Sequence, residues 1–189
     1  MYKTIVKPTL VLTVICVVVS GLLALTYNLT GVGEASTGIA QDKLDEYAET
    51  LLPGASFKQT DLSAETVVDG VTLLGVYQDE RGNGCALNLS AKGYYGENSL
   101  NLFIAFDNNG AIAGIYPIST QETPGLGSKA TEADYLQQYI GKSEPVTVSK
   151  DGSGDIDDIS GATVSSESLG NAVNEAFTFY AEIKGGLQA

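Results

Sequence analysis

The first strong pattern along the chain is a long uncharged stretch near the N-terminus. Residues 8–33 contain no charged side chain, and Leu10–Leu25 is almost wholly apolar. About 20 helical residues, rising about 1.5 Å each, cross a hydrocarbon core of about 30 Å. Lys3 and Lys7 precede the stretch, and positive charge favours the cytoplasmic side of a membrane. The pattern predicts one transmembrane helix, with the rest of the chain on the extracytoplasmic side of the cell membrane.

A cleaved signal peptide is the alternative for this segment, because it also has a basic start and an apolar core. That core is usually shorter, and a small-x-small cleavage motif follows it. Leu23-Ala24-Leu25 and Tyr27-Asn28-Leu29 contain no such motif. We therefore expect residues 1–33 to form a cytoplasmic N-terminus, an uncleaved anchor and a linker, and residues 34–189 to form an exported domain.

Beyond this segment the apolar residues first follow a helical period and then alternate. In Gln41–Leu52 they recur every three or four residues along one stripe, and Pro53-Gly54 ends the pattern. Farther along, short runs rich in β-branched and aromatic residues are separated by turn sequences such as Asn109-Gly110. The predicted strands are Thr66–Asp69, Val71–Gln78, Cys85–Ala91, Leu100–Phe106 and Ala111–Ile118.

The last third of the chain is expected to be mainly helical. A helix is predicted near Glu132–Ile140, a short strand at Val146–Ser149, and a final amphipathic helix over about Ser166–Ile183. The short connections between the predicted strands imply antiparallel pairing. The sequence therefore predicts an α+β fold, a curved antiparallel sheet with helices packed on it, preceded by one N-terminal transmembrane helix.

Composition narrows the possible chemistry. The chain has no histidine and only two cysteines, Cys16 and Cys85, which lie in different predicted parts. Histidine-dependent hydrolysis, histidine-ligated zinc or haem, and a disulfide framework are therefore excluded. The acidic loop Asp151–Asp158 lacks the glycine and glutamate of a calcium loop. We predict no metal site and no catalytic side chain for a complete enzyme.

The net charge of the predicted exported domain limits the partners that it can bind. All 23 acidic residues but only eight of the ten basic ones follow residue 33, so the predicted exported domain carries a formal charge of −15. Nucleic acid and anionic lipid headgroups are poor partners for such a surface.

The strongest chemical signal is Ser160-Gly161-Ala162-Thr163, just before the final helix. A loop that enters a helix N-terminus presents free backbone N–H groups and partial positive charge, which suit a phosphate. The small residues let the backbone approach that phosphate, and Ser160, Ser165 and Ser166 can add hydroxyl donors. We expect the helix to start at Ser165 or Ser166. Thr163 offers an alcohol oxygen for a phosphate ester. The alternative is a serine-capped helix after a glycine turn.

A second unusual loop is Gln121–Lys129. Pro124 and two glycines define a tight path, and Leu126 is an apolar residue on a turn. Glu122, Thr123 and Lys129 offer polar groups at the ends of the loop. Such a loop can place backbone N–H groups and one leucine against a planar heteroaromatic ring. The alternative is an ordinary connection from a sheet to a helix.

Together these stretches resemble the FMN-binding subunits of two membrane redox complexes. One is the G subunit of the Rnf-type ferredoxin:NAD⁺ oxidoreductase, and the other is the C subunit of the sodium-pumping NADH:quinone oxidoreductase. The short chain without large insertions is more similar to the Rnf subunit. Gln121 stands where relatives often carry a basic residue. The motifs that carry the resemblance are Leu51-Leu52-Pro53-Gly54, Gly93-Tyr94-Tyr95-Gly96, Glu122-Thr123-Pro124-Gly125-Leu126-Gly127 and Asp157–Thr163.

The resemblance implies a covalent flavin. FMN would be linked through its phosphate to Thr163, by a flavin transferase that uses FAD and a metal ion and recognises Asp157 and the Ser160–Thr163 turn. The residues that would shape the attachment turn are Ser160, Gly161 and Ala162. Those that would lie near the flavin ring are Glu122, Thr123, Gly125, Leu126 and Gly127.

The function implied is that of a membrane-anchored electron carrier, not a complete enzyme by itself. It would pass electrons between other membrane subunits of a complex that couples ferredoxin oxidation and NAD⁺ reduction to ion translocation. Two alternatives of the same class are the C subunit of the sodium pump and a stand-alone exported flavoprotein. A cofactor-free anchored binding or scaffold module is the alternative of another class.

Overall fold

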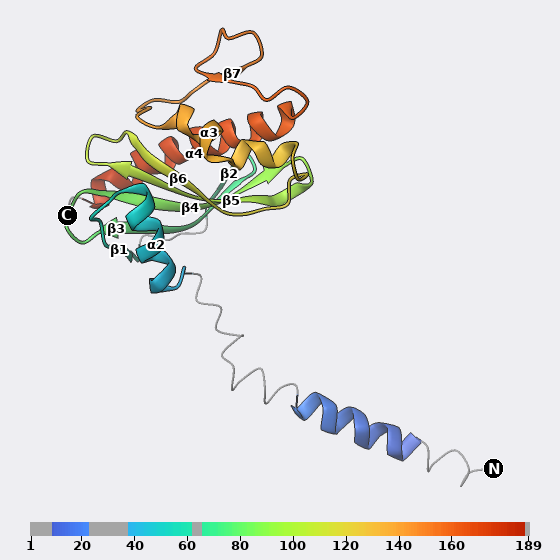
Figure 1. Ribbon diagram of the computed structural model, residues 1–189. Coiled ribbons are helices and arrows are strands. Elements are labelled where there is room, and N and C mark those ends of the chain that lie inside the picture. Colours follow the sequence, from blue (N-terminus) through green and yellow to red (C-terminus); the bar gives the residue numbers. More distant parts are fainter. Residues whose placement is uncertain (1–8, 23–37, 62–65, 188–189) are drawn as a thin grey trace. The chain divides into compact units, whose positions relative to one another are not determined.

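The computed structural model describes residues 9–22, 38–61 and 66–187 (Figure 1). The chain divides into two compact units, Met1–Thr37 and Gly38–Ala189. In the first unit, residues 9–22 form a helix whose large apolar side chains are all exposed. The remainder of the predicted anchor and linker, residue 8 and residues 23–33, lies outside the described residues. Within the described ranges, we find no helix with the length and apolar character needed to cross a membrane.

The second unit is built on one antiparallel sheet, as the sequence predicts. Its strands run in the order β1-β3-β4-β5-β6, and β2 also pairs with β3. Asp69 and Gly70, between β2 and β3, both have positive φ (45° and 77°), as a two-residue type I′ hairpin turn requires. The strands are β1 (Phe57–Gln59), β2 (Thr66–Val68), β3 (Val71–Asp79), β4 (Gly84–Gly93), β5 (Gly96–Asp107) and β6 (Ile112–Thr120).

Helices cover both faces of the sheet (Figure 1). One face packs against α4 (Thr163–Leu187) through a core that includes Leu87, Leu89 and Leu169. The other packs against α2 (Gln41–Leu51) through a second core built around Phe103. Alternate residues of β4 and β5 enter opposite cores because successive side chains of a strand point to opposite faces. The predicted α+β fold is confirmed, and this sheet contains one strand, β1, that the sequence pattern did not predict.

The segment between β6 and α4 differs in detail from the prediction. The helix expected near Glu132–Ile140 is broken into two short pieces, α3 and η2, and a further short helix, η1, precedes them. A two-stranded parallel pair follows, in which the predicted strand Val146–Ser149 contributes only its last two residues. The elements are η1 (Gly127–Thr131), α3 (Ala133–Leu136), η2 (Gln137–Tyr139), β7 (Val148–Ser149) and β8 (Ile156–Asp157).

The final helix begins earlier than predicted. α4 starts at Thr163 rather than at Ser165 or Ser166. The Ser166 N–H donates to the Ala162 carbonyl at 3.0 Å, which places the first helical hydrogen bond across Thr163. Gly161, with φ of 84°, lets the chain turn sharply before this point. Thr163 is therefore the first residue of the helix.

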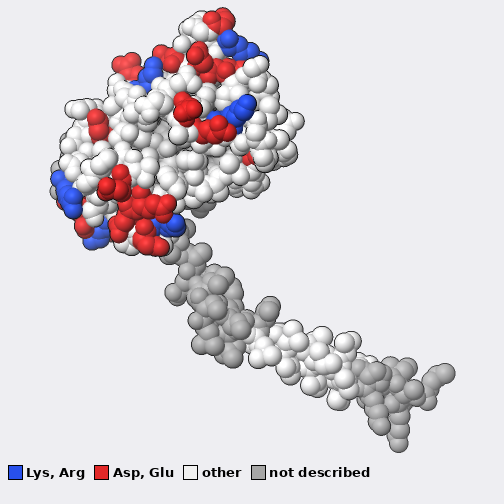
Figure 2. Space-filling model, viewed as in Figure 1, with Lys and Arg blue, Asp and Glu red and all other residues white. Residues whose placement is uncertain are grey.

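Acidic side chains gather over α2 (Figure 2). This helix exposes its four carboxylates, and Lys43 pairs with Glu46 at 2.7 Å. Such an exposed pair contributes little to stability. The group forms the solvated face of a helix whose other face is buried.

Candidate functional site

A cavity of about 510 Å³ opens where the two predicted loops meet. Its walls come from the β4–β5 turn, the loop after β6, and the first turn of α4, which lie far apart in the sequence. This volume falls within the range of about 300–1,000 Å³ found for small-molecule sites. The residues that line it are Tyr94, Tyr95, Glu122, Thr123, Leu126, Gly127, Lys150, Gly161, Ala162, Thr163, Val164 and Ser165.

Glu122 joins the three walls. Its side chain is buried, and its two carboxylate oxygens accept hydrogen bonds from different segments. The Tyr94 N–H donates to Oε1 at 2.8 Å, and the Ser165 hydroxyl donates to Oε2 at 2.6 Å. A carboxylate that accepts such bonds holds its donors more strongly than a neutral acceptor does. Glu122 therefore ties the β4–β5 turn and the start of α4 to the loop after β6.

Two glycines allow this carboxylate to pack tightly. A Cβ atom on Gly93 would lie 2.2 Å from Glu122 Oε1, and one on Gly127 would lie 2.6 Å from both Glu122 Oε2 and Ser165 Oγ. These separations are far below van der Waals contact. Both positions therefore need glycine for the walls of the cavity to approach one another this closely.

A pair of tyrosines forms one side of the opening. Tyr94 and Tyr95 are more than half exposed and meet edge to face, with ring centroids 5.2 Å apart. The Tyr95 hydroxyl lies 3.0 Å from Thr123 Oγ1. Leu126 and Val164 add exposed apolar surface to the same cavity. Exposed aromatic and apolar side chains around a concave site suit a planar ring system.

Thr163 belongs to the wall of the cavity that the first turn of α4 forms. Its hydroxyl donates a hydrogen bond to Asp158 Oδ2 at 3.0 Å. Lys150 Nζ lies 3.9 Å from the same oxygen, and Lys150 also lines the cavity. A hydroxyl, a lysine and the N-terminus of α4 therefore meet at one place, which suits a phosphate.

Seven of the ten predicted site residues line this cavity. The three that do not are Ser160 and Gly125, each next to a lining residue, and Asp157, which is exposed in β8. Gly125 has φ of 72°, and its N–H donates to Ser128 Oγ, so it shapes the loop. The seven that line the cavity are Glu122, Thr123, Leu126, Gly127, Gly161, Ala162 and Thr163.

The serines after Thr163 do not serve as the free hydroxyl donors that the sequence suggested. Ser165 and Ser166 are buried. Ser165 donates to Glu122, and the Ser166 hydroxyl donates to the Ala162 carbonyl at 3.2 Å and accepts the Ile159 N–H at 3.1 Å. The earlier start of α4 explains this, because it turns both side chains into the protein.

Comparisons with known proteins match both the segment that forms the cavity and almost the whole chain. Residues 93–178 match the model of the FMN-binding domain family. The G subunit of the ion-translocating oxidoreductase complex of Methanosarcina acetivorans is 29% identical over 188 residues, covering 97% of this chain and 98% of the relative. The G subunit of the Na⁺-translocating ferredoxin:NAD⁺ oxidoreductase complex of Acetobacterium woodii is 31% identical over 198 residues, covering 95% and 93%. The chain belongs to this family of G subunits.

The resemblance that the sequence motifs indicated is thus confirmed. Every residue that lines the cavity of this G-subunit chain falls within the segment that matches the FMN-binding domain. The helix α2 and the strands β1 to β3 lie before that segment. They complete the sheet and its second core without contributing a wall of the cavity.

Five residues that line the cavity are not among the ten predicted. Val164 and Ser165 directly follow Thr163, whereas the other three could not be selected from the motifs alone. Tyr94 and Tyr95 belong to a turn that the resemblance included, but nothing in the sequence brings that turn to the Glu122 loop. Lys150 lies in a polar loop without any motif. The signal for the tyrosines was their adjacency in a hairpin turn, where large aromatic side chains are unusual.

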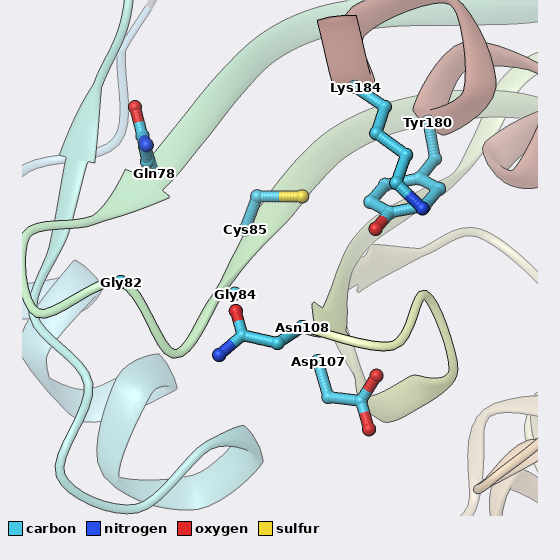
Figure 3. Close-up of a pocket in the computed structure, with 8 residues that line it drawn as sticks. All are labelled: Gln78, Gly82, Gly84, Cys85, Asp107, Asn108, Tyr180 and Lys184. Carbon is cyan, nitrogen blue, oxygen red and sulfur yellow. The ribbon is translucent and has the colours of Figure 1, made fainter. Parts of the chain in front are cut away.

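A second cavity of the G-subunit chain lies at the other end of the sheet, beside the β3–β4 and β5–β6 turns (Figure 3). Its volume is about 190 Å³, and it is lined in part by Cys85, Asp107, Tyr180 and Lys184. This volume is below the usual range for small-molecule sites. Asp107 already accepts the N–H groups of Asn109 and Ala111. We assign the ligand site to the larger cavity.

Proposed function

We propose that the protein is an FMN-carrying electron-transfer subunit of an ion-translocating oxidoreductase complex. The observation that carries this proposal is the cavity formed within the FMN-binding segment by Tyr94, Glu122, Thr123 and Thr163. The relatives are named as G subunits of such complexes. When bound, FMN supplies the redox chemistry, and the protein supplies position and electrostatics.

The cavity residues fit the two ends of FMN. Tyr94, Tyr95 and Leu126 offer aromatic and apolar surface for the flavin ring. Lys150 and the N-terminus of α4 offer positive charge for the phosphate. The Glu122 carboxylate is committed to Tyr94 and Ser165, so it holds the walls in place and is not a free group for the ring.

We further propose that the FMN phosphate is esterified to Thr163. The Thr163 hydroxyl lines the cavity at the start of α4, beside the only lysine among the lining residues. A covalent link makes physical sense outside the cytoplasm, since a non-covalent cofactor there is lost by dilution. The attachment requires a flavin transferase, which would recognise the turn that contains Ser160, Gly161 and Ala162, together with the exposed Asp157.

We also propose that residues 1–33 anchor the protein in the cell membrane and that residues 34–189 lie on the extracytoplasmic side. Support comes from the uncharged stretch of residues 8–33 and from the exposed apolar side chains of the helix at residues 9–22. In that helix, the hydroxyls of Thr13 and Ser20 donate to the carbonyls of Thr9 and Cys16. Such bonds satisfy polar groups within the helix, as a lipid environment requires. The partners would be the other membrane subunits of the complex.

The test is covalent labelling of the full-length chain. The chain is co-produced with a flavin transferase, purified in detergent, and compared with Thr163→Ala and Thr178→Ala. Thr178 is an exposed threonine of the same helix whose hydroxyl donates within the helix, so it is a matched control. We expect the wild type and Thr178→Ala to gain the mass of FMN less one water and to fluoresce on a denaturing gel. Thr163→Ala should gain neither.

A failure to label the wild type would show which part of the proposal is wrong. A dark wild-type band beside a substrate that the transferase does label would exclude the covalent link. A colourless protein under native conditions would then exclude FMN binding as well, and would favour the cofactor-free module.

A further inference from the structure

We propose that Asp158 is the base that takes the proton from Thr163 during flavin attachment. This inference rests on the attachment proposed above. It assigns a catalytic side chain to the acceptor protein itself, whereas the sequence motif directed attention to the neighbouring Asp157.

The geometry distinguishes the two aspartates. Asp158 Oδ2 accepts the Thr163 hydroxyl at 3.0 Å, and the Asp158 side chain is only 2% exposed. Asp157 is exposed, and its backbone N–H donates to Gln138 Oε1. A base must lie within hydrogen-bond reach of the proton that it takes. Asp158 meets this condition. Within the described part of the chain, no hydrogen bond joins the Asp157 side chain to Thr163.

The second oxygen of Asp158 supports a functional role. Oδ1 is buried and has no hydrogen-bond partner within residues 9–22, 38–61 and 66–187. A buried carboxylate that leaves one oxygen unpaired costs stability, and such a group calls for an explanation. A carboxylate that accepts a proton during the reaction accounts for the unpaired oxygen. A carboxylate with only a structural role would be expected to have both oxygens hydrogen-bonded.

The backbone holds the two side chains together. The Asp158 N–H donates to the Ser149 carbonyl at 2.9 Å, which attaches this residue to the end of β7. Gly161, with φ of 84°, and the hydrogen bond from the Ala162 N–H to the Ile159 carbonyl turn the chain back. Thr163 returns to Asp158 after only five residues. The contact is thus built into the attachment turn and does not depend on a bound ligand.

The reaction that this geometry supports is a phosphoryl-type transfer from a flavin dinucleotide. Thr163 Oγ1 attacks the phosphorus on the FMN half, so that an O–P bond forms and the P–O bond to AMP breaks. AMP leaves with the electron pair of that bond, and the proton of the threonine hydroxyl passes to Asp158. No oxidation or reduction occurs. The flavin dinucleotide and its metal ion are supplied by the transferase.

Lys150 completes the arrangement. Its ammonium lies 3.9 Å from Asp158 Oδ2 and lines the cavity into which the phosphate would enter. The carboxylate and an incoming phosphate both carry negative charge and would repel each other. The positive charge of Lys150 offsets that repulsion, and its exposed side chain is able to move toward the phosphate.

The experiment measures the rate of attachment on the full-length chain. Wild type, Asp158→Asn, Asp158→Ala and Asp134→Asn are each incubated with purified transferase, FAD and Mg²⁺, and covalent FMN is followed by intact mass. Asp134 is exposed in α3 and provides a control that removes the same charge away from the site. General-base catalysis contributes about 10²- to 10⁴-fold. We expect the maximal rate of Asp158→Asn to fall at least about 100-fold, with the same half-saturating FAD concentration, and Asp134→Asn to behave as wild type.

Chemical rescue separates a base from a structural residue. Formate is a small carboxylate that fits the space left by Asp158→Ala, so added formate should accelerate labelling of that variant and leave wild type unchanged. Labelling of Asp158→Asn at the wild-type rate would overturn the inference. A slow Asp158→Ala variant that unfolds at the wild-type temperature but does not respond to formate would also overturn it. Absence of labelling in wild type itself would instead refute the attachment proposal on which the inference rests.

Discussion

Glu122 is a single buried carboxylate on which two distant segments depend. Its oxygens accept the Tyr94 N–H and the Ser165 hydroxyl, which lie 28 and 43 residues away along the chain. The resemblance seen in the sequence implied that Glu122 lies near the flavin ring. In the structure, both carboxylate oxygens accept hydrogen bonds from protein donors, so Glu122 links separate segments of the protein.

Replacing this carboxylate should destabilise the fold and loosen the cavity. Glu122→Ala leaves the partly buried Tyr94 N–H and the buried Ser165 hydroxyl without their acceptor, and a buried group left in this way costs about 1–3 kcal/mol. We expect the free energy of unfolding in urea to fall by at least about 2 kcal/mol. Glu132→Ala removes an exposed carboxylate from the same region and should change it by less than about 0.5 kcal/mol. Equal effects of the two substitutions would contradict this role of Glu122.

Cys85 gives the fold a dependence on alkaline pH. Burial raises the pKa of its thiol from 9.0 to about 12. Between these values the unfolded chain has lost the thiol proton while the folded chain keeps it. The contribution of Cys85 to stability is therefore fully present below about pH 9 and falls by about 1.4 kcal/mol per pH unit above it.

The measurement compares wild type with Cys85→Ala. We expect the unfolding free energy of wild type to fall by about 1.4 kcal/mol more than that of the variant between about pH 8 and pH 10. Other groups titrate in both proteins, so the difference isolates Cys85. Parallel pH profiles would show that the thiol is not shielded from water.

At the scale of elements, α4 packs against β7 at a glycine. A Cβ atom on Gly170 would lie 2.5 Å from Val148 Cγ2. Glycine inside a helix costs about 0.5–1 kcal/mol relative to alanine. The helix tolerates this cost because the close approach brings α4 to the loop that carries Lys150 and Asp158.

A double-mutant cycle tests this account of α4. Gly170→Ala alone should lower stability by about 1 kcal/mol, because the overpacking cost exceeds the gain in helix propensity. In the Val148→Ala background the same change should raise stability by about 0.5 kcal/mol. Thermal unfolding of the four proteins gives the coupling. A gain from Gly170→Ala in both backgrounds would mean that α4 and β7 are not in tight contact.

At the scale of the molecule, one sheet separates two cores. The core under α4 contains Leu169, and the core under α2 contains Leu44; both leucines are buried. Strands β4 and β5 supply side chains to both cores. Loss of either core therefore removes support from the same strands, and we expect residues 38–187 to unfold as one cooperative unit.

Substitutions on opposite faces should consequently shift the same transition. Leu44→Ala and Leu169→Ala each delete a buried side chain, at a cost of about 2–5 kcal/mol. Far-ultraviolet circular dichroism and tyrosine fluorescence should give coincident transitions for both variants, with an unchanged denaturant slope. A separate early transition in Leu44→Ala would show that α2 unfolds independently of the sheet.

The acidic, histidine-free composition also belongs to this scale. The chain carries a formal charge of −13 and no histidine. Apart from two cysteines and Arg81, the side chains available for chemistry are hydroxyls, carboxylates, amides and lysines. This matches a protein whose redox chemistry belongs to a bound cofactor and whose own side chains only attach and position it.

Much of this protein was determined by short-range sequence features. Periodicity predicted α2, five of the six strands of the main sheet and α4, and Gly and Asn placed the hairpin turns. The loops Glu122–Gly127 and Ser160–Thr163 were selected as site segments from their small-residue motifs together with the resemblance of those motifs to FMN-binding subunits. Alternation, turn chemistry and small-residue motifs act over a few residues and can be read from neighbours in the chain.

Tertiary structure decided the rest. It broke the predicted helix at Glu132–Ile140, placed α2 and α4 on opposite faces, and moved the start of α4 to Thr163. It joined the tyrosine turn to Glu122, and it placed Asp158 rather than Asp157 at the Thr163 hydroxyl. These outcomes depend on contacts between distant segments and on which face of a turn becomes buried. Packing and hydrogen-bond satisfaction determine them across the whole domain, so no local pattern contains them.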